Sequence, residues 1–311
     1  MWKTLRQLSA ATALIISLCL SQPGSAGELE IPDTGWFHDE VYVPTLSALC
    51  AGGTDLSKGC DAVRAREIVD ASDYPWSAIG RINFASIRIR MHCTGTLIGE
   101  RLVLTAAHCL YNYWRRSWIP AESIRFVAGY QRGEFVTFSK GARYIVGGIH
   151  DTNSRHFKGG PDTDWALIEL KDSIGVTAGY LGITAYDQAG LDRALALGAT
   201  ISLSGYPQIR PHVLSLATDC GAVKLPVNKN LVVHRCTAMW GDSGAPILLV
   251  EDGKITVIGL MSALVHGGDE IFGVAPSAVA FRSAVLDMLR SDRDAQVPSA
   301  HEITTGELPV R

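Results

Sequence analysis

A serine between two glycines is the first candidate for chemistry in this sequence. Ser243 lies in the segment Trp240–Pro246, where Gly241 and Gly244 allow the backbone to turn sharply. A serine hydroxyl is a useful nucleophile at neutral pH only when a base accepts its proton and fixed donors stabilise the oxyanion. The turn could direct the amide N–H groups of Gly241 and Ser243 towards one such oxyanion. Because these residues also make an ordinary turn, the motif needs partners elsewhere in the chain.

A histidine and an aspartate are suited to be those partners. His108 follows a run of small residues and could act as the general base. Asp164 starts a strongly apolar segment and could accept a hydrogen bond from the other imidazole nitrogen, which would set the tautomer and favour the imidazolium. Each residue alone also has a purely structural interpretation, and Asp162 rivals Asp164 but lacks the same strand context. Together the three residues predict nucleophilic catalysis by Ser243.

The other histidines and the cysteines do not indicate a metal site. No H-E-x-x-H motif is present, so we expect neither a metal nor an organic cofactor. An even number of cysteines after the N-terminal leader favours disulfides in an oxidising compartment, although spacing alone leaves the connectivity open. A zinc site is the alternative, but tight C-x-x-C pairs are absent. These cysteines are Cys50, Cys60, Cys93, Cys109, Cys220 and Cys236.

Short apolar segments between turn residues must position these groups. Their alternation with Gly, Pro, Asp and Asn favours an antiparallel barrel or sandwich over βαβ units. An Asp-Gly pair within residues 251–254 predicts a hairpin turn. One long helix is expected over residues 276–290, because Pro276 suits a first turn and apolar residues recur at four-residue spacing. The predicted strands are 76–80, 94–98, 102–105, 123–127, 165–170, 200–204, 231–234, 246–250 and 255–260.

The two ends of the chain differ in composition from its middle. Residues 1–26 have a basic start, an apolar stretch of about 13 residues and a small-residue cleavage site, which predicts a signal peptide. That stretch is shorter than the roughly 20 residues of a membrane span, so no stable membrane anchor is expected, with an uncleaved anchor as the alternative. Residues 27–67 read as a pro-segment or N-terminal extension, and residues 292–311 as a mobile tail.

The overall charge excludes one class of partner. The formal net charge is −3, and no run or stripe of Lys and Arg is present. This balance argues against nucleic acid as a partner. The hydrophobic content of 47% is enough to bury one large core or two small ones.

Four motifs occur in a fixed order along the chain: Cys93–Leu97, Thr105–Cys109, Asp164–Leu167 and Gly241–Pro246. They resemble those of the chymotrypsin/trypsin family of serine endopeptidases, and most of all its secreted bacterial branches, including the glutamyl-endopeptidase-like group. The resemblance covers roughly residues 68–290. It implies an all-β fold of two six-stranded antiparallel β-barrels, over residues 68–185 and 186–291, with a C-terminal helix and the active site between the barrels.

The resemblance also implies where substrate binds. An extended peptide would pair with the backbone of a wall strand. No carboxylate lies where trypsin-like members recognise Arg or Lys, and Met261 lies where glutamyl endopeptidases commonly carry a histidine. We therefore expect a neutral pocket for an uncharged side chain. The expected pocket residues are Thr237, Ala238, Ser262, Ala263 and Leu264.

The expected disulfides pair each cysteine with its nearest neighbour along the chain: Cys50–Cys60, Cys93–Cys109 and Cys220–Cys236.

Activation by proteolysis is a further expectation. The segment that starts at Ile68 resembles the mature N-terminus of family members, in which the freed α-amine pairs with the aspartate before the nucleophile, here Asp242. Arg64 and Arg66 offer a basic processing site, so the active chain is expected to begin at Ile68 or Glu67. The alternative is that residues 67–69 are only the entry to the first strand and that local donors hold Asp242.

The function that these features predict is that of a secreted or periplasmic serine endopeptidase. It would act on protein or peptide substrates through an acyl-enzyme on Ser243, and it is expected to be monomeric. Two alternatives stay open: a protease-like binding protein without activity, and a narrow processing enzyme with a single protein substrate.

Overall fold

The computed structural model describes residues 58–84, 92–112, 115–148, 160–218, 220–267 and 270–296. The predicted signal peptide, most of the predicted pro-segment and the predicted Cys50–Cys60 bridge lie outside the described residues. None of the helices in the described part is both long and apolar enough to cross a membrane.

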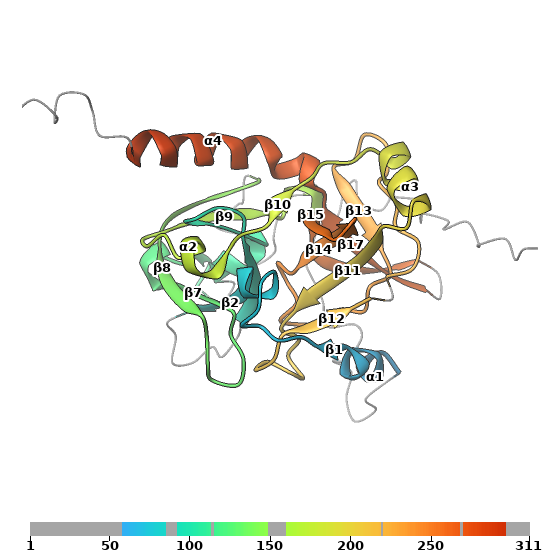
Figure 1. The fold of residues 1–311 in the computed structure, drawn as a ribbon, viewed down its shortest axis with the longest axis horizontal. Coiled ribbons are helices and arrows are strands. Elements are labelled where there is room, and N and C mark those ends of the chain that lie inside the picture. The colour runs from blue at the N-terminus through green and yellow to red at the C-terminus, as the bar shows by residue number, and fades with distance from the viewer. Residues whose placement is uncertain are drawn as a thin grey trace, which may run out of the picture. The chain divides into compact units, whose positions relative to one another are not determined.

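The first half of the described chain forms a closed barrel of six strands (Figure 1). Each strand pairs antiparallel with both of its neighbours, which leaves the barrel without an open edge. The first predicted six-stranded antiparallel barrel is therefore present. In order around the barrel the strands are β2 (Ile79–Phe84), β3 (His92–Leu97), β4 (Leu102–Thr105), β9 (Ala166–Leu170), β8 (Thr137–Val146) and β7 (Ile124–Ala128).

Apolar side chains from every wall fill this barrel. Ile79, Ile82, Phe126 and Leu167 are fully buried, so the strand pattern read from the sequence marks the core. β8 was not predicted, because its two buried positions are Ser139 and Gly141 and its exposed positions include Phe138. The segment therefore lacks the alternation of buried apolar and exposed polar residues that marks a strand in a sequence.

The second half differs from the prediction of a second closed, six-stranded antiparallel barrel. It contains two sheets, and among the described residues a single bridge between Gly259 and Ser277 links β15 to the segment that follows the smaller sheet. One six-stranded sheet has the order β1 (Glu67–Ile68), β12 (Ser215–Ala217), β11 (Thr200–Gly205), β14 (Pro246–Glu251), β15 (Lys254–Leu260) and β10 (Gly182–Ile183). The smaller sheet has the order β13 (Leu231–His234), β17 (Glu270–Pro276) and β16 (Ala263–Gly267).

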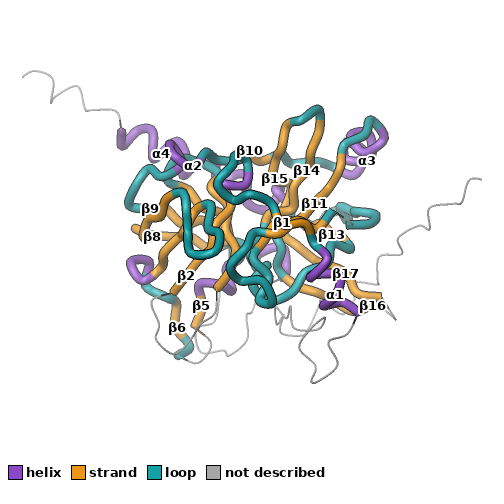
Figure 2. The backbone as a smooth tube through the Cα atoms, turned by 60° about the horizontal axis from the view of Figure 1, so that its bottom comes forward, coloured by secondary structure: helices purple, strands orange, loops and turns teal. Residues whose placement is uncertain are grey.

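The open form of the second half has a topological reason. Two-residue strands from linking segments occupy both edges of the larger sheet: β1 comes from the N-terminal segment and β10 from the connection between the halves. β10 runs parallel to β15, so the sheet is also not purely antiparallel. Edge strands of only two residues offer few N–H and C=O groups with which to extend the sheet into a closed barrel. Figure 2 shows α1 (Lys58–Ala65) leading into β1 against this half.

Two local predictions can be compared directly. The predicted hairpin is present, because Asp252 and Gly253 both have positive φ values of 50° and 75° and Glu251 pairs with Lys254. The C-terminal helix α4 (Ala278–Gln296) begins two residues later than predicted, because Pro276 is the last residue of β17 and pairs with Leu231.

The described part of the chain contains few helices, and the longest of them covers the first half. α4 packs on the first half, where the rings of Phe281 and Trp165 lie 6.4 Å apart (Figure 1). α3 (Gln188–Ala196) was not predicted, because its nine residues bury only Leu191 and Ala194; its N-terminus is capped by Asp187, whose carboxylate accepts from the Gly190 N–H at 2.7 Å. The remaining short elements are α2 (Gly175–Ala178), β5 (Tyr111–Asn112), β6 (Ser117–Trp118) and the 3₁₀ turns η3 (Trp76–Ala78), η4 (Ala107–Leu110), η5 (Ala121–Ser123) and η6 (Pro161–Thr163).

Candidate active site

A histidine and a carboxylate meet at one end of the first barrel. His108 lies in η4 directly after β4, and Asp164 lies between η6 and β9; β4 and β9 are paired, which brings the two residues together. The His108 Nδ1 lies 2.7 Å from Asp164 Oδ2, and the His108 backbone N–H donates to Oδ1 at 2.9 Å. In the neutral imidazole, Nδ1–H then donates to the carboxylate and Nε2 is free to accept a proton.

The carboxylate of Asp164 is completely buried and has a third donor from the other half of the molecule. The Ser262 hydroxyl, between β15 and β16, donates to Asp164 Oδ2. Three hydrogen bonds offset the cost of burying this charge. Sequence reasoning placed Ser262 only in a pocket wall, because no local pattern links two residues that are 98 positions apart.

The two glycines around Ser243 are both required by the backbone. Gly241 and Gly244 have φ values of +95° and +79°. A side chain at Gly244 would also meet Thr105 Oγ1 and the Thr94 carbonyl at 2.3 Å each. The turn that the sequence suggested is therefore one that only glycine adopts without strain at these positions. Ser243 itself has an exposed fraction of 6%.

The Ser243 turn is attached to the first barrel next to His108. The Thr94 N–H donates to the Ser243 carbonyl at 2.9 Å, and the Thr94 hydroxyl donates to the Gly241 carbonyl at 2.8 Å. The sulfur of Cys109, the residue after His108, lies 3.9 Å from the Ser243 carbonyl oxygen. Within the described part of the chain the Ser243 hydroxyl makes no hydrogen bond; catalytic hydrogen bonds often tighten only when substrate is bound.

The N–H groups of the Ser243 turn fall into two pairs, one bonded within the protein and one available to a ligand. In the bonded pair, the N–H of Asp242 donates to the Met239 carbonyl at 3.0 Å, and that of Gly244 donates to the Met261 carbonyl at 2.7 Å. By contrast, the N–H groups of Gly241 and Ser243 donate to no acceptor among the described residues. These are the two groups that the sequence assigned to an oxyanion site.

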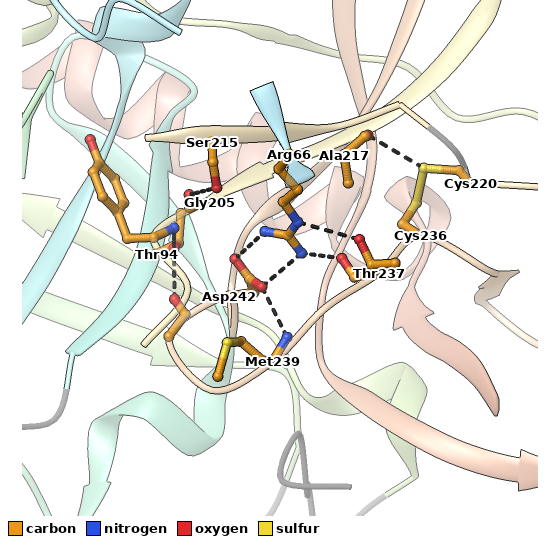
Figure 3. A network of polar contacts seen from close by, with 12 residues as sticks. Arg66, Thr94, Gly205, Ser215, Ala217, Cys220, Cys236, Thr237, Met239 and Asp242 are labelled. Carbon is orange, nitrogen blue, oxygen red and sulfur yellow. Dashed lines mark hydrogen bonds and ion pairs between the residues drawn. A yellow bond between two sulfur atoms is a disulfide. The ribbon is translucent and has the colours of Figure 1, made fainter. Parts of the chain in front are cut away.

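Asp242, between Gly241 and Ser243, is paired with an arginine in the intact chain. Arg66 donates to both carboxylate oxygens, from Nη1 to Oδ1 at 3.1 Å and from Nη2 to Oδ2 at 2.9 Å (Figure 3). Sequence reasoning predicted that Asp242 needs a cation but assigned that cation to a freed α-amine at Ile68 or Glu67. In this structure Ile68 is half-exposed and belongs to β1, which pairs with β12.

The predicted pocket residues lie around the same site. Thr237, Ala238 and Ala263 come from the segment before the Ser243 turn and from β16; Ala238 and Ala263 are buried. β16 forms one edge of its three-stranded sheet, and Leu264 pairs with Gly273 on the other side. An edge strand can pair with an extended peptide.

The two predicted disulfides that the structure describes are present. Cys93 is bonded to Cys109, and Cys220 to Cys236. The first pair also belongs to the one cluster of potential metal donors in the described ranges, with His108. Because both cysteines are in a disulfide, they offer no thiolate to a metal ion.

Several known proteins are similar to this chain in sequence. The glutamyl endopeptidase of Bacillus licheniformis is 32% identical over 202 residues, which are 64% of this chain and 57% of that protein. The extracellular metalloprotease of Bacillus subtilis is 25% identical over 54% of this chain and 56% of its own length, and human tissue-type plasminogen activator is 23% identical over 80% of this chain and 48% of its own length. The chain thus spans about half the length of these relatives.

A solved structure shows the same fold. The structure of Glu endopeptidase in complex with MPD aligns with a TM-score of 0.53 and 24% identity, covering 70% of this chain and 93% of that one. The model of the Trypsin family matches residues 67–281, which include His108, Asp164 and Ser243. Because the family model matches most of the chain, this chain belongs to the trypsin family.

Proposed function

We propose that this chain is a serine endopeptidase in which Ser243 is the nucleophile, His108 the general base and Asp164 the residue that orients it. The observation that carries the proposal is the 2.7 Å contact between His108 Nδ1 and Asp164 Oδ2, beside a serine flanked by two positive-φ glycines. The relatives that match the chain are named glutamyl endopeptidase, extracellular metalloprotease and tissue-type plasminogen activator. The first two names support the cleavage of peptide bonds, while the serine mechanism rests on the residues of this chain.

The reaction follows from these positions. His108 Nε2 accepts the proton as the Ser243 hydroxyl attacks the peptide carbonyl, and the buried Asp164 carboxylate stabilises the imidazolium that forms. The N–H groups of Gly241 and Ser243 stabilise the oxyanion of the tetrahedral intermediate. His108 then returns the proton to the leaving amine, which leaves an acyl-enzyme on Ser243. Water hydrolyses this ester by the same steps, and the free serine is regenerated.

For the side chain before the cleaved bond, we propose an uncharged group. Met261 is completely buried next to Ser262, and neither Thr237 nor Ala238 brings a charge to the expected pocket base. The name of the Bacillus licheniformis relative points instead to glutamate. One observation also favours a substrate side chain that accepts a hydrogen bond. The ring of His234 lies where a side chain at Gly273 would be, and its Nε2 has no hydrogen-bond partner in the described part of the chain. A peptide library that varies this position distinguishes the two.

The decisive test of the activity is the removal of the nucleophile. Ser243→Ala should lower kcat by roughly 10⁴–10⁶, the range that substituted triads show. The same variant should no longer react with a fluorophosphonate, while its unfolding transition stays that of the wild type. If it retains about a tenth of the activity, the assignment of Ser243 is wrong. A wild-type protein that neither cleaves peptides nor reacts with the probe would instead be the inactive, protease-like binding protein.

We also propose that the protein is exported as a monomer to an oxidising compartment. The N-terminal composition and the two disulfides support this localisation. Fractionation of expressing cells, followed by N-terminal sequencing and size-exclusion chromatography, tests the leader, the compartment and the monomer together.

A further inference from the structure

The ion pair between Arg66 and Asp242 has no part in the triad chemistry, yet it lies directly next to the turn that carries it. The two side chains have exposed fractions of 1% and 0%. Both carboxylate oxygens accept from the guanidinium, which is the bidentate geometry that arginine alone among the cationic side chains provides.

The guanidinium also joins the two ends of the loop that leads to the nucleophile (Figure 3). Its Nη2 donates to the Thr237 carbonyl, and its Nε donates to the Thr237 hydroxyl at 3.4 Å. At the other end of the loop, the Met239 N–H donates to Asp242 Oδ2 at 3.0 Å. A side chain at Gly205 would lie only 2.5 Å from Asp242 Oδ1, so the carboxylate fits closely against β11. Arg66 and Asp242 together therefore hold the loop from residue 237 to 242.

The backbone of Arg66 is itself held by contacts with α1 and with the side chain of Arg210. Its N–H donates to the Val63 carbonyl at 3.4 Å, and its carbonyl accepts from Arg210 Nη1 at 3.2 Å. The next two residues form β1, which pairs with β12. The cation is thus delivered by an ordered segment that is continuous with the sheet.

We propose that Arg66 is a positioning residue that supplies, within the intact chain, the cation that holds the oxyanion-binding turn. The proposal rests on the endopeptidase function above. Without a cation, the buried Asp242 carboxylate would be unfavourable and would move towards water, taking the adjacent Gly241 and Ser243 peptides with it. The chain is then active while residue 66 remains attached, and a cut before Glu67 or Ile68 would separate this cation from the enzyme.

The test compares Arg66→Gln with Arg66→Lys and with the matched control Arg64→Gln. Arg64 lies two residues earlier, and its pair with Asp61 is exposed. We expect Arg66→Gln to lower kcat on the order of 10²-fold with KM nearly unchanged, as when an oxyanion donor is lost, and to slow labelling by a fluorophosphonate. Arg66→Lys keeps the positive charge but not the bidentate pair with Asp242 or both contacts to Thr237, so it should recover only part of kcat. Arg64→Gln should stay within about twofold of the wild type.

The wild type supplies a second, independent measurement. Active material captured with a fluorophosphonate is sequenced from its N-terminus, and we expect the captured chain to contain residue 66. Captured wild type that starts at Glu67 or Ile68 would overturn the proposal, even if Arg66→Gln fails to fold. So would an Arg66→Gln variant with wild-type kcat, or an Arg64→Gln variant that loses as much as Arg66→Gln. Failure of the wild type to cleave any peptide would instead contradict the proposed function.

Discussion

The two halves of the molecule hold their share of the site in different ways. The first half is a closed antiparallel barrel, and it positions His108 after β4 and Asp164 before β9, two strands that pair with each other. The second half is open, with β1 and β10 at the edges of its larger sheet, and it carries Ser243 on a turn outside any strand. A closed barrel positions side chains through its own hydrogen-bond network, whereas the turn depends on glycine backbone and on the buried Arg66–Asp242 pair.

After loss of the nucleophile, the largest decrease in kcat should come from breaking the His108–Asp164 pair of the first half. Asp164→Asn should lower kcat by roughly 10⁴, the loss known for this substitution in triad enzymes, because the imidazole then takes the wrong tautomer. Asp162→Asn, two residues earlier, is the matched control and should stay within about twofold. Steady-state kinetics on one peptide substrate checks both, and equal losses would favour Asp162 as a partner.

The two disulfides of the described residues offer a balanced comparison, because one lies in each half and both join residues 16 positions apart. Replacing both cysteines of either pair by alanine should lower the free energy of unfolding by about 3 kcal/mol, since the loops have equal length. Only the loss of Cys93–Cys109 should also lower kcat, because Cys109 follows His108 and contacts the Ser243 turn. Urea unfolding and kinetics separate the two effects; equal kcat for both variants would contradict this positioning.

A buried histidine in each half should make stability depend on pH. Burial, together with the charge of the nearby Arg81, lowers the pKa of His92 to about 4, and burial alone lowers the pKa of His234 to about 4. The unfolded chain binds protons at these sites near the ordinary value of 6.5, so stability is complete above that pH and falls as pH decreases towards 4.

The slope should be at most about 1.4 kcal/mol per pH unit for each histidine. Unfolding by urea at pH 7, 6 and 5 measures it, and His92→Gln or His234→Gln should each remove about half. A wild type with equal stability at pH 7 and 5 would show that neither ring is buried in its neutral form.

The smallest expected effect tests the contact between the halves. Ser262→Ala removes the hydroxyl that donates to Asp164 across the site, and kcat should fall about tenfold, the equivalent of one hydrogen bond to a charged group. Ser204→Ala is the matched control, because this serine is equally buried and its hydroxyl has no partner among the described residues. A Ser262→Ala variant as active as Ser204→Ala would mean that the first barrel orients Asp164 unaided.

The amino-acid sequence by itself determined the features that depend on neighbouring residues. The glycines around Ser243 indicated a sharp turn, Asp252-Gly253 indicated a hairpin, and the apolar run after Asp164 indicated a strand. Each of these follows from steric limits or side-chain periodicity over a few positions, and the structure contains all three.

Only the tertiary structure decided which distant residues complete the site. Ser262 meets Asp164 from 98 positions away, and Arg66 meets Asp242 from 176 positions away. The same holds for the open second half, where β1 and β10 come from linking segments to occupy the sheet edges. Contacts at such separations are made by strand pairing and by the need to neutralise buried charge, and both are satisfied by whichever segment the fold brings near. The spacing of residues along the chain therefore does not indicate which distant segment supplies each contact.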